Sequence, residues 1–150
     1  MTTSPYKFDP LTSGRFTFTS VGKRSIEKVV DFIPTGSPNV MNLSFGDRLP
    51  DGSIDYVTVS DNGDIRRVLA TVVSIINNFT SSRPEVWIYF EGSTVERTRL
   101  YNRTLKIYYP IFSKLFEIWG VIKMGDDLDS IPFHPRAAIA YFGFLIKRID

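Results

Sequence analysis

The first sixty residues of the chain alternate between apolar and polar positions, which is the pattern of strands with one buried face. Phe16 and Phe18 share one face of a first strand, which ends at a turn around Gly22. Three more strands follow. Ile26, Val30 and Phe32 share one face of the next strand, Met41, Leu43 and Phe45 line the third, and the fourth is formed by Ile54, Tyr56, Val57 and Val59. We therefore expect a start of four strands, the last two joined by a hairpin loop over residues 47–53.

Helical spacing replaces this alternation after Asn62-Gly63. Apolar side chains then recur three and four positions apart, at Ile65, Val68, Leu69, Val72, Ile76 and Phe79. The pattern predicts an amphipathic helix that is capped by Asp61 or Asn62 and ends before Pro84. The next segment, Glu85–Glu91, is apolar on both faces, which is typical of a strand in the middle of a sheet.

A second helix is predicted to begin at Gly92-Ser93, because Ser93 and Glu96 have the spacing of a capping box. Pro110 should end or kink it. Two late strands follow, over residues 115–123 and 139–148, with a loop between them at residues 124–136.

The resulting order, β-β-β-β-α-β-α-β-β, predicts an α+β fold with a mainly antiparallel sheet and both helices packed on one face. A length of 150 residues is that of a single domain. We expect residues 1–14, which are polar and contain two prolines, to begin this domain loosely.

Composition excludes several kinds of site and location. The chain has no cysteine, which rules out disulfides, thiolate catalysis and sulfur-ligated zinc. Its start lacks a secretory signal pattern, and its longest apolar run, residues 137–146, is too short to cross a bilayer. We therefore expect a cytoplasmic protein with no membrane partner. A net charge of +2 does not by itself indicate nucleic-acid binding.

One arginine of the second helix stands out on a helical wheel. Apolar residues of this helix fall within about 80° of Arg97 at about 100° per residue, namely Leu100, Tyr101, Leu105, Ile107 and Tyr108. Arg97 should therefore be buried, and a buried cation requires an anionic partner. That partner is either a structural carboxylate, such as Glu91, Asp47 or Asp55, or a bound phosphate or carboxylate that Ser93 and Thr94 also contact.

Other polar residues form less specific patterns. Arg99, Arg103 and Lys106 make an outward basic face, which Lys23, Arg24, Arg66 and Arg67 could extend. His134 is the only histidine, and the aspartates of residues 126–129 lack the ligand ladder of a calcium loop, so we expect no metal. No nucleotide-binding or hydrolase motif occurs, and no cofactor is expected.

Four segments of the sequence resemble an uncharacterised family of bacterial proteins of about 150 residues. They are NVMNLSFGD at residues 39–47, VSDNGDIRRVLATVV at 59–73, FEGSTVERTRLYNR at 90–103 and YFGFLIKRI at 141–149. The run G-S-T-x-x-R-T-R-L-Y, which begins at Gly92, is the most specific part. The resemblance implies a small bacterial cytoplasmic protein that forms one complete domain, and it carries over no catalytic residue.

Three functions fit these observations. The favoured one is a non-enzymatic binding module for a nucleotide, a nucleic-acid backbone or an acidic protein, with Arg97 as buried anchor, Ser93 and Thr94 as hydrogen-bond donors, and Arg99 and Arg103 as longer-range attractors. The second is a metal-independent ribonuclease of bacterial toxin type, in which Arg97 or Arg99 stabilises the phosphate and Tyr101 or His134 moves protons. The third is an adaptor or homo-oligomer that uses an aromatic sheet face around Trp87, Tyr89 and Trp119.

Overall fold

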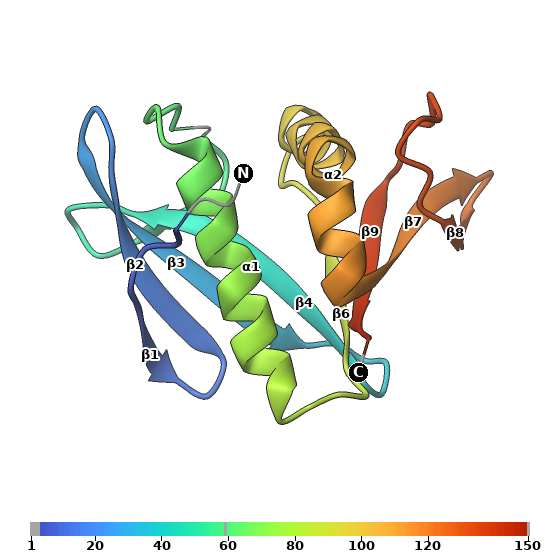
Figure 1. Cartoon of the computed structure of the whole chain (residues 1–150), viewed down its shortest axis with the longest axis horizontal. Helices are drawn as coiled ribbons and strands as arrows, with labels where there is room; N and C mark the ends of the chain where they lie inside the picture. Colours follow the sequence, from blue (N-terminus) through green and yellow to red (C-terminus); the bar gives the residue numbers. More distant parts are fainter. Residues whose placement is uncertain (1–3, 59, 150) are drawn as a thin grey trace. The chain divides into compact units, whose positions relative to one another are not determined.

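Nine strands and two helices form in the part of the chain that the computed structural model describes, residues 4–58 and 60–149 (Figure 1). The strands pair as a mainly antiparallel sheet, so the protein has the α+β fold that the sequence predicts. Contacts divide the chain into two compact units. Unit 1 comprises Met1–Ile33 and Leu43–Arg83, and unit 2 comprises Pro34–Asn42 and Pro84–Asp150.

Unit 1 places one amphipathic helix on antiparallel strands. It contains β1 (Phe8–Thr12), β2 (Arg15–Val21), most of β3 (Ser25–Pro34) and of β4 (Val40–Arg48), β5 (Ile54–Asp55) and α1 (Ile65–Ser81). β1 pairs with β2, β2 with β3, and β5 with β4, each pair antiparallel. Aromatic packing joins helix and sheet: the Phe79 ring of α1 stacks on Phe32, with centroids 4.0 Å apart, and meets the edge of Phe16.

Unit 2 contains β6 (Trp87–Phe90), α2 (Val95–Leu115), β7 (Phe116–Met124), β8 (Asp127–Pro132) and β9 (Gly143–Arg148). Its strands lie in the order β6-β9-β7-β8, and the first three residues of β4 pair with β6 in parallel. β6 therefore has a neighbour on each side, which confirms the central strand predicted near Glu85–Glu91. Phe144, Phe133, Tyr141 and Phe90 are in contact in the core of this unit.

Two expectations about unit 1 need correction, the first of them near its start. Residues 1–14 were expected to begin loosely, but β1 occupies residues 8–12 and Tyr6 is buried. The strand escapes sequence analysis because it is an edge strand whose side chains are largely exposed, so no apolar alternation marks it.

The second correction concerns the segment between β4 and α1. β5 ends at Asp55, because the Asp55 carboxylate accepts the backbone N–H groups of Val57 and Thr58 and turns the chain. Val59, which was expected to end this strand, lies outside the described residues. The N-cap of α1 is Asp64, not Asp61 or Asn62, and its side chain makes no capping hydrogen bond.

In unit 2, the ends of the predicted elements shift. Thr94, not Ser93, is the N-cap of α2 and accepts the N–H of Arg97. Pro110 does not end this helix, which continues to Leu115. The loop predicted at residues 124–136 contains β8, another exposed edge strand, which follows β7 through a tight turn with Gly125 at φ 64°.

No helix within the described ranges is both long enough and apolar enough to cross a membrane.

We predict that Gly120→Ala destabilises the protein by about 1–3 kcal/mol, because overpacking of a closed core costs that much. A Cβ at Gly120 would lie 2.1 Å from the ring of Tyr141, which is buried and packs against Phe133 and Phe144. Urea unfolding measures the change. Gly36→Ala is the matched control, since nothing lies within 4 Å of its added Cβ, and equal stability of the two variants would contradict the prediction.

Candidate functional site

The start of α2 is held by a compact set of backbone and hydroxyl contacts. The N–H of Gly92 donates to Oγ1 of Thr98 at 2.9 Å, and that hydroxyl donates to the carbonyl of Thr94 at 3.2 Å. A Cβ on Gly92 would lie 2.3 Å from the backbone nitrogen of Thr98, so only glycine fits here. Thr94 then caps the helix through the N–H of Arg97. Much of the G-S-T-x-x-R-T run therefore builds the first turn itself.

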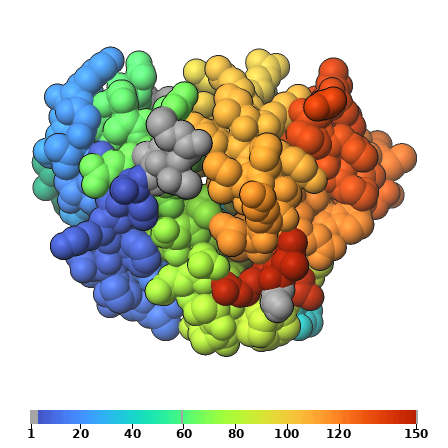
Figure 2. All heavy atoms as spheres, viewed as in Figure 1, coloured from blue at the N-terminus to red at the C-terminus, as the bar shows by residue number. Residues whose placement is uncertain are grey.

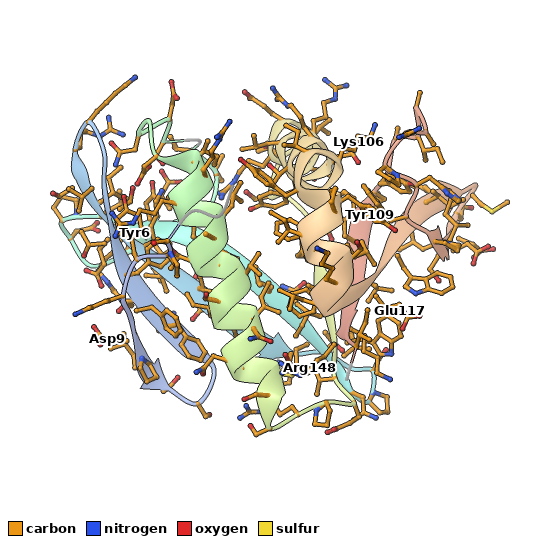
Figure 3. All side chains as sticks on the ribbon, in the orientation of Figure 1. Tyr6, Asp9, Lys106, Tyr109, Glu117 and Arg148 are labelled. Atoms are coloured by element: carbon orange, nitrogen blue, oxygen red, sulfur yellow. The ribbon has the colours of Figure 1, made fainter. Side chains whose placement is uncertain are left out.

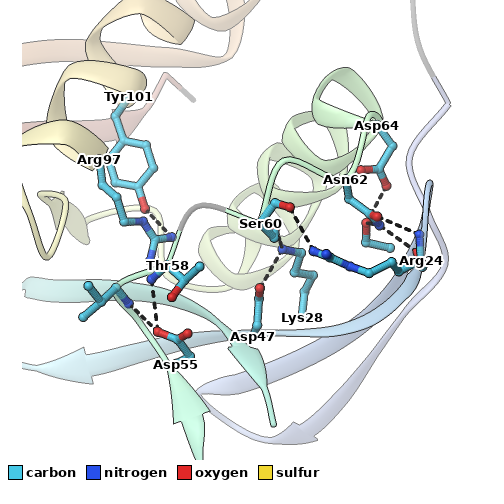
Figure 4. A network of polar contacts seen from close by, with 12 residues as sticks. Arg24, Lys28, Asp47, Asp55, Thr58, Ser60, Asn62, Asp64, Arg97 and Tyr101 are labelled. Carbon is cyan, nitrogen blue, oxygen red and sulfur yellow. Dashed lines mark hydrogen bonds and ion pairs between the residues drawn. The ribbon is translucent and has the colours of Figure 1, made fainter.

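Arg97 is 6% exposed, which confirms the burial predicted from the helical wheel. Its Nη2 donates to the hydroxyl of Tyr101 at 3.3 Å, one turn along the helix (Figure 4). Burial raises the pKa of Tyr101 and outweighs the lowering by the Arg97 charge, so the phenol stays protonated at neutral pH. Arg97 also takes part in contacts beyond this one.

The carboxylates predicted as partners for Arg97 each have interactions of their own. Asp47 forms an ion pair with Lys28, with 2.6 Å between Nζ and Oδ1. Glu91 accepts the hydroxyl of Tyr89 at 3.2 Å. Asp55 accepts the two backbone N–H groups that end β5.

The outer face of α2 carries two exposed guanidinium groups, Arg99 and Arg103, one helical turn apart. The residues of this helix, yellow to orange in Figure 2, contribute to the visible surface of unit 2. Lys106, which was predicted to extend this basic face, is half-buried and donates to the carbonyl of Ala137 at 3.0 Å (Figure 3). Ser93 is exposed just before the helix. The exposed cations of α2 near its start are thus Arg99 and Arg103, with the acidic Glu96 beside them.

Sequence analysis missed a buried ion pair in unit 1. Lys28 is 3% exposed, and its Nζ also donates to Oγ of Ser60 at 2.7 Å, besides pairing with Asp47 (Figure 4). The ammonium group lies 5.5 Å from the centroid of the Phe45 ring. The signal in the sequence is the position of this lysine, because alternation along β3 places it on the same inward face as Val30 and Phe32.

A second network of unit 1 surrounds Asp64. Its carboxylate accepts the hydroxyls of Tyr6 and Ser20, each at 2.5 Å. Burial by itself would raise the pKa of Asp64, but the hydrogen bonds from Ser20 and Tyr6 outweigh it and hold the pKa below its ordinary value. Burial and the bond to Asp64 raise the pKa of Tyr6. Tyr6 also joins β2 to α1, because its hydroxyl accepts the N–H of Val21 and its N–H donates to Thr71 (Figure 3).

The remaining candidates occupy separate places. His134 is exposed, and its backbone N–H donates to the hydroxyl of Tyr141. Strand pairing brings Tyr89 and Trp119 onto one sheet face, on either side of Leu145, and Trp87 follows on the same face of β6. No group of histidine and carboxylate residues in the described ranges could hold a metal ion.

Comparison with known proteins identifies a family. The model of DUF6934, a family of unknown function, matches residues 2–149, so the chain belongs to this family. No curated protein and no solved structure matches the chain significantly.

We predict that Asp47→Ala lowers the free energy of unfolding by about 3–5 kcal/mol, because it leaves the Lys28 ammonium buried without a counter-charge. Urea denaturation is the measurement. The double variant Lys28→Met, Asp47→Leu should recover most of the loss. Glu27→Ala is the control: it breaks the exposed pair with Arg48 and should cost less than about 1 kcal/mol. Equal losses for Asp47→Ala and Glu27→Ala would refute the buried pair.

We also predict that Asp64 contributes to acid unfolding. Because its pKa is lower in the folded state, its contribution is present above the ordinary aspartate value of about 3.9 and is lost as pH falls through the folded pKa. Asp64→Asn should therefore show a flatter loss of stability below about pH 4 than the wild-type chain. Denaturant unfolding at several pH values between neutral and acidic tests this. If the unfolding free energies of the variant and the wild type fall in parallel with pH, the pKa of Asp64 does not differ between the folded and unfolded states.

Proposed function

We propose that this member of the DUF6934 family is a non-enzymatic module of the bacterial cytoplasm that binds an anionic ligand at the start of α2. The ligand is a nucleotide, a nucleic-acid backbone or an acidic protein segment. The observation that carries the proposal is the exposed pair Arg99 and Arg103. Within the described residues, the side chains of this pair make no hydrogen bond or ion pair. The helix start to which they belong is held by hydrogen bonds. Guanidinium groups in that state can bind phosphate or carboxylate oxygens in pairs.

The other residues of this site have graded roles in the proposal. Ser93 is exposed just before the first turn and is one of the two hydroxyl residues of the proposed site. The Thr94 hydroxyl accepts the N–H of Arg97, and it can still donate its own hydrogen. In the proposal Arg97 is the buried anchor, and Arg99 and Arg103, on the outer face of the helix, attract the ligand from a longer range. Glu96, in the same first turn, weakens the attraction, so its removal should strengthen binding.

The test compares charge-matched variants of the whole chain. Thermal shift and fluorescence anisotropy are measured with inorganic phosphate, ATP, a 20-nucleotide RNA and poly-glutamate at low and high salt. Arg99→Gln, Arg103→Gln should weaken binding of at least one of these probes about tenfold or more, which corresponds to about 1.4 kcal/mol or more. The control Lys114→Gln, Lys123→Gln removes two exposed cations elsewhere and should bind as the wild type does. Glu96→Gln should bind more tightly.

Several outcomes would overturn the proposal. An equal loss of affinity in the double variant and its control, relative to the wild-type chain, would show that net charge alone determines binding. Cleavage of the RNA, abolished by Arg97→Lys in a folded protein, would favour the ribonuclease alternative with Tyr101 or His134 in proton transfer. A complex or oligomer whose stability does not change with salt concentration would favour the adaptor alternative at Trp87 and Trp119, because salt does not screen the burial of apolar surface.

Arg97→Lys also separates two roles of the buried cation, since lysine keeps the charge but loses the guanidinium fork. If Arg97 is the anchor, the variant loses affinity for the probe while the melting temperature of the free protein stays close to that of the wild type. If the melting temperature falls and affinity does not, Arg97 is a structural cation.

A further inference from the structure

Unit 1 gathers four exposed cations from two segments that are far apart in the sequence. Lys23 and Arg24 lie in the turn between β2 and β3, and Arg66 and Arg67 lie in the first turn of α1. We call these four residues the unit 1 cluster. They are other residues than the α2 pair Arg99 and Arg103, so the two sets can be varied one at a time and a ligand of this cluster does not rest on the proposed function.

Asn62 fastens the two segments together. Its backbone carbonyl accepts the N–H of Lys23 at 2.9 Å, and its side chain bonds both the N–H and the carbonyl of Arg24, each at 2.8 Å (Figure 4). Asn62 is 5% exposed, so these bonds are shielded from water. Gly22 permits the approach, because a Cβ there would lie 1.9 Å from the Asn62 carbonyl oxygen. The turn is therefore held directly beside the start of α1.

Three side chains of the cluster have defined positions. The Lys23 chain runs along Gly63, since a Cβ built on Gly63 would lie 3.8 Å from both Cγ and Cε of Lys23. One nitrogen of Arg24 donates to the carbonyl of Ser60 at 2.9 Å, which leaves most of its five donors for other partners. The Arg67 guanidinium lies over the ring of Tyr6, 4.0 Å from its centroid. Side chains held in this way lose little conformational entropy when they bind.

The carboxylates beside the cluster do not neutralise it. Asp64 turns its carboxylate inward to Tyr6 and Ser20, and for that reason it makes no cap with the helix. The first turn of α1 contains no acidic residue. Asp61, which is exposed, is the other carboxylate between β5 and α1, and its single negative charge leaves the four cations with an excess of positive charge. Four cations and the positive end of the helix dipole thus share one corner of unit 1.

We infer that the unit 1 cluster binds the phosphodiester backbone of a nucleic acid. Three of the four cations are arginines, whose forked donors match phosphate oxygens, and two of them are already fixed in place. Protein interfaces deplete charge at their core and enrich aromatic residues, whereas nucleic-acid interfaces are strongly positive. The aromatic ring beside this cluster, Tyr6, is buried, and the exposed apolar neighbours are Val21 and Ile65. Contact with the backbone alone predicts binding that depends strongly on salt and little on base sequence.

Fluorescence anisotropy with labelled 20-nucleotide DNA and RNA, single-stranded and duplex, tests the inference between about 50 and 200 mM salt. The test variant is Lys23→Gln, Arg24→Gln, Arg66→Gln, which leaves the Arg67–Tyr6 contact intact. We expect a loss of affinity of about tenfold or more at low salt, and a salt slope that is smaller by about two units, because each phosphate contact contributes about 0.7–0.9 to the slope. The matched control, Lys114→Gln, Lys123→Gln, Arg136→Gln, removes three exposed cations of unit 2 and should keep wild-type affinity.

The remaining results each overturn the inference. They are no binding of any nucleic acid by the wild-type chain, an equal loss in test and control variants with both still folded by circular dichroism, and displacement of the nucleic acid by poly-glutamate at equal charge, which would indicate an acidic protein partner. The α2 variant Arg99→Gln, Arg103→Gln is measured in parallel. If it alone loses binding, the proposed function stands and the unit 1 cluster does not; if the cluster variant alone loses binding, the reverse holds.

Discussion

The structure of unit 1 depends on the rule that a buried polar group must find hydrogen-bond partners. Asn62 is nearly inaccessible to solvent, and its amide bonds Ser20 as well as both backbone groups of Arg24. Ser20 in turn donates to Asp64. Loss of the Asn62 side chain would remove the acceptor of the Arg24 backbone N–H, and a buried polar group left without a partner costs about 1–3 kcal/mol. The network therefore fixes where the β2–β3 turn meets the start of α1.

The same constraint shapes the start of α2 in unit 2, with different residues. There the backbone N–H of Gly92 and the carbonyl of Thr94 both use the hydroxyl of Thr98, while Thr94 caps the helix. In unit 1 the aspartate at the N-cap is drawn away by two hydroxyls, and in unit 2 the threonine performs the ordinary capping role. Two helices of one chain thus begin in different ways because the polar groups around them differ.

Periodicity predicts the interior elements well and the polar contacts poorly. The apolar stripe from Ile65 to Phe79 predicts α1, and the wheel of α2 predicts a buried Arg97, because burial follows from spacing along one helix. The caps, the ion-pair partner of Lys28 and the edge strands β1 and β8 could not be predicted this way. Each depends on a partner distant in sequence, such as Asp47 for Lys28, or on backbone pairing that the side chains do not signal. The position of Lys23 and Arg24 beside α1 could not be predicted from periodicity either, since it depends on contacts with Asn62 that only the fold brings about.

The contacts also separate residues that build the protein from residues that can serve a ligand. Gly92, Thr94 and Thr98 are accounted for by the first turn of α2, and their presence in a motif needs no ligand to explain it. Arg66 and Arg99 are different, because each is exposed and its side chain makes no hydrogen bond or ion pair within the described residues. A long cationic side chain in that position carries no structural reason to be arginine rather than another polar residue. The search for function in this fold should therefore begin at its exposed arginines, where binding would supply the reason that folding does not.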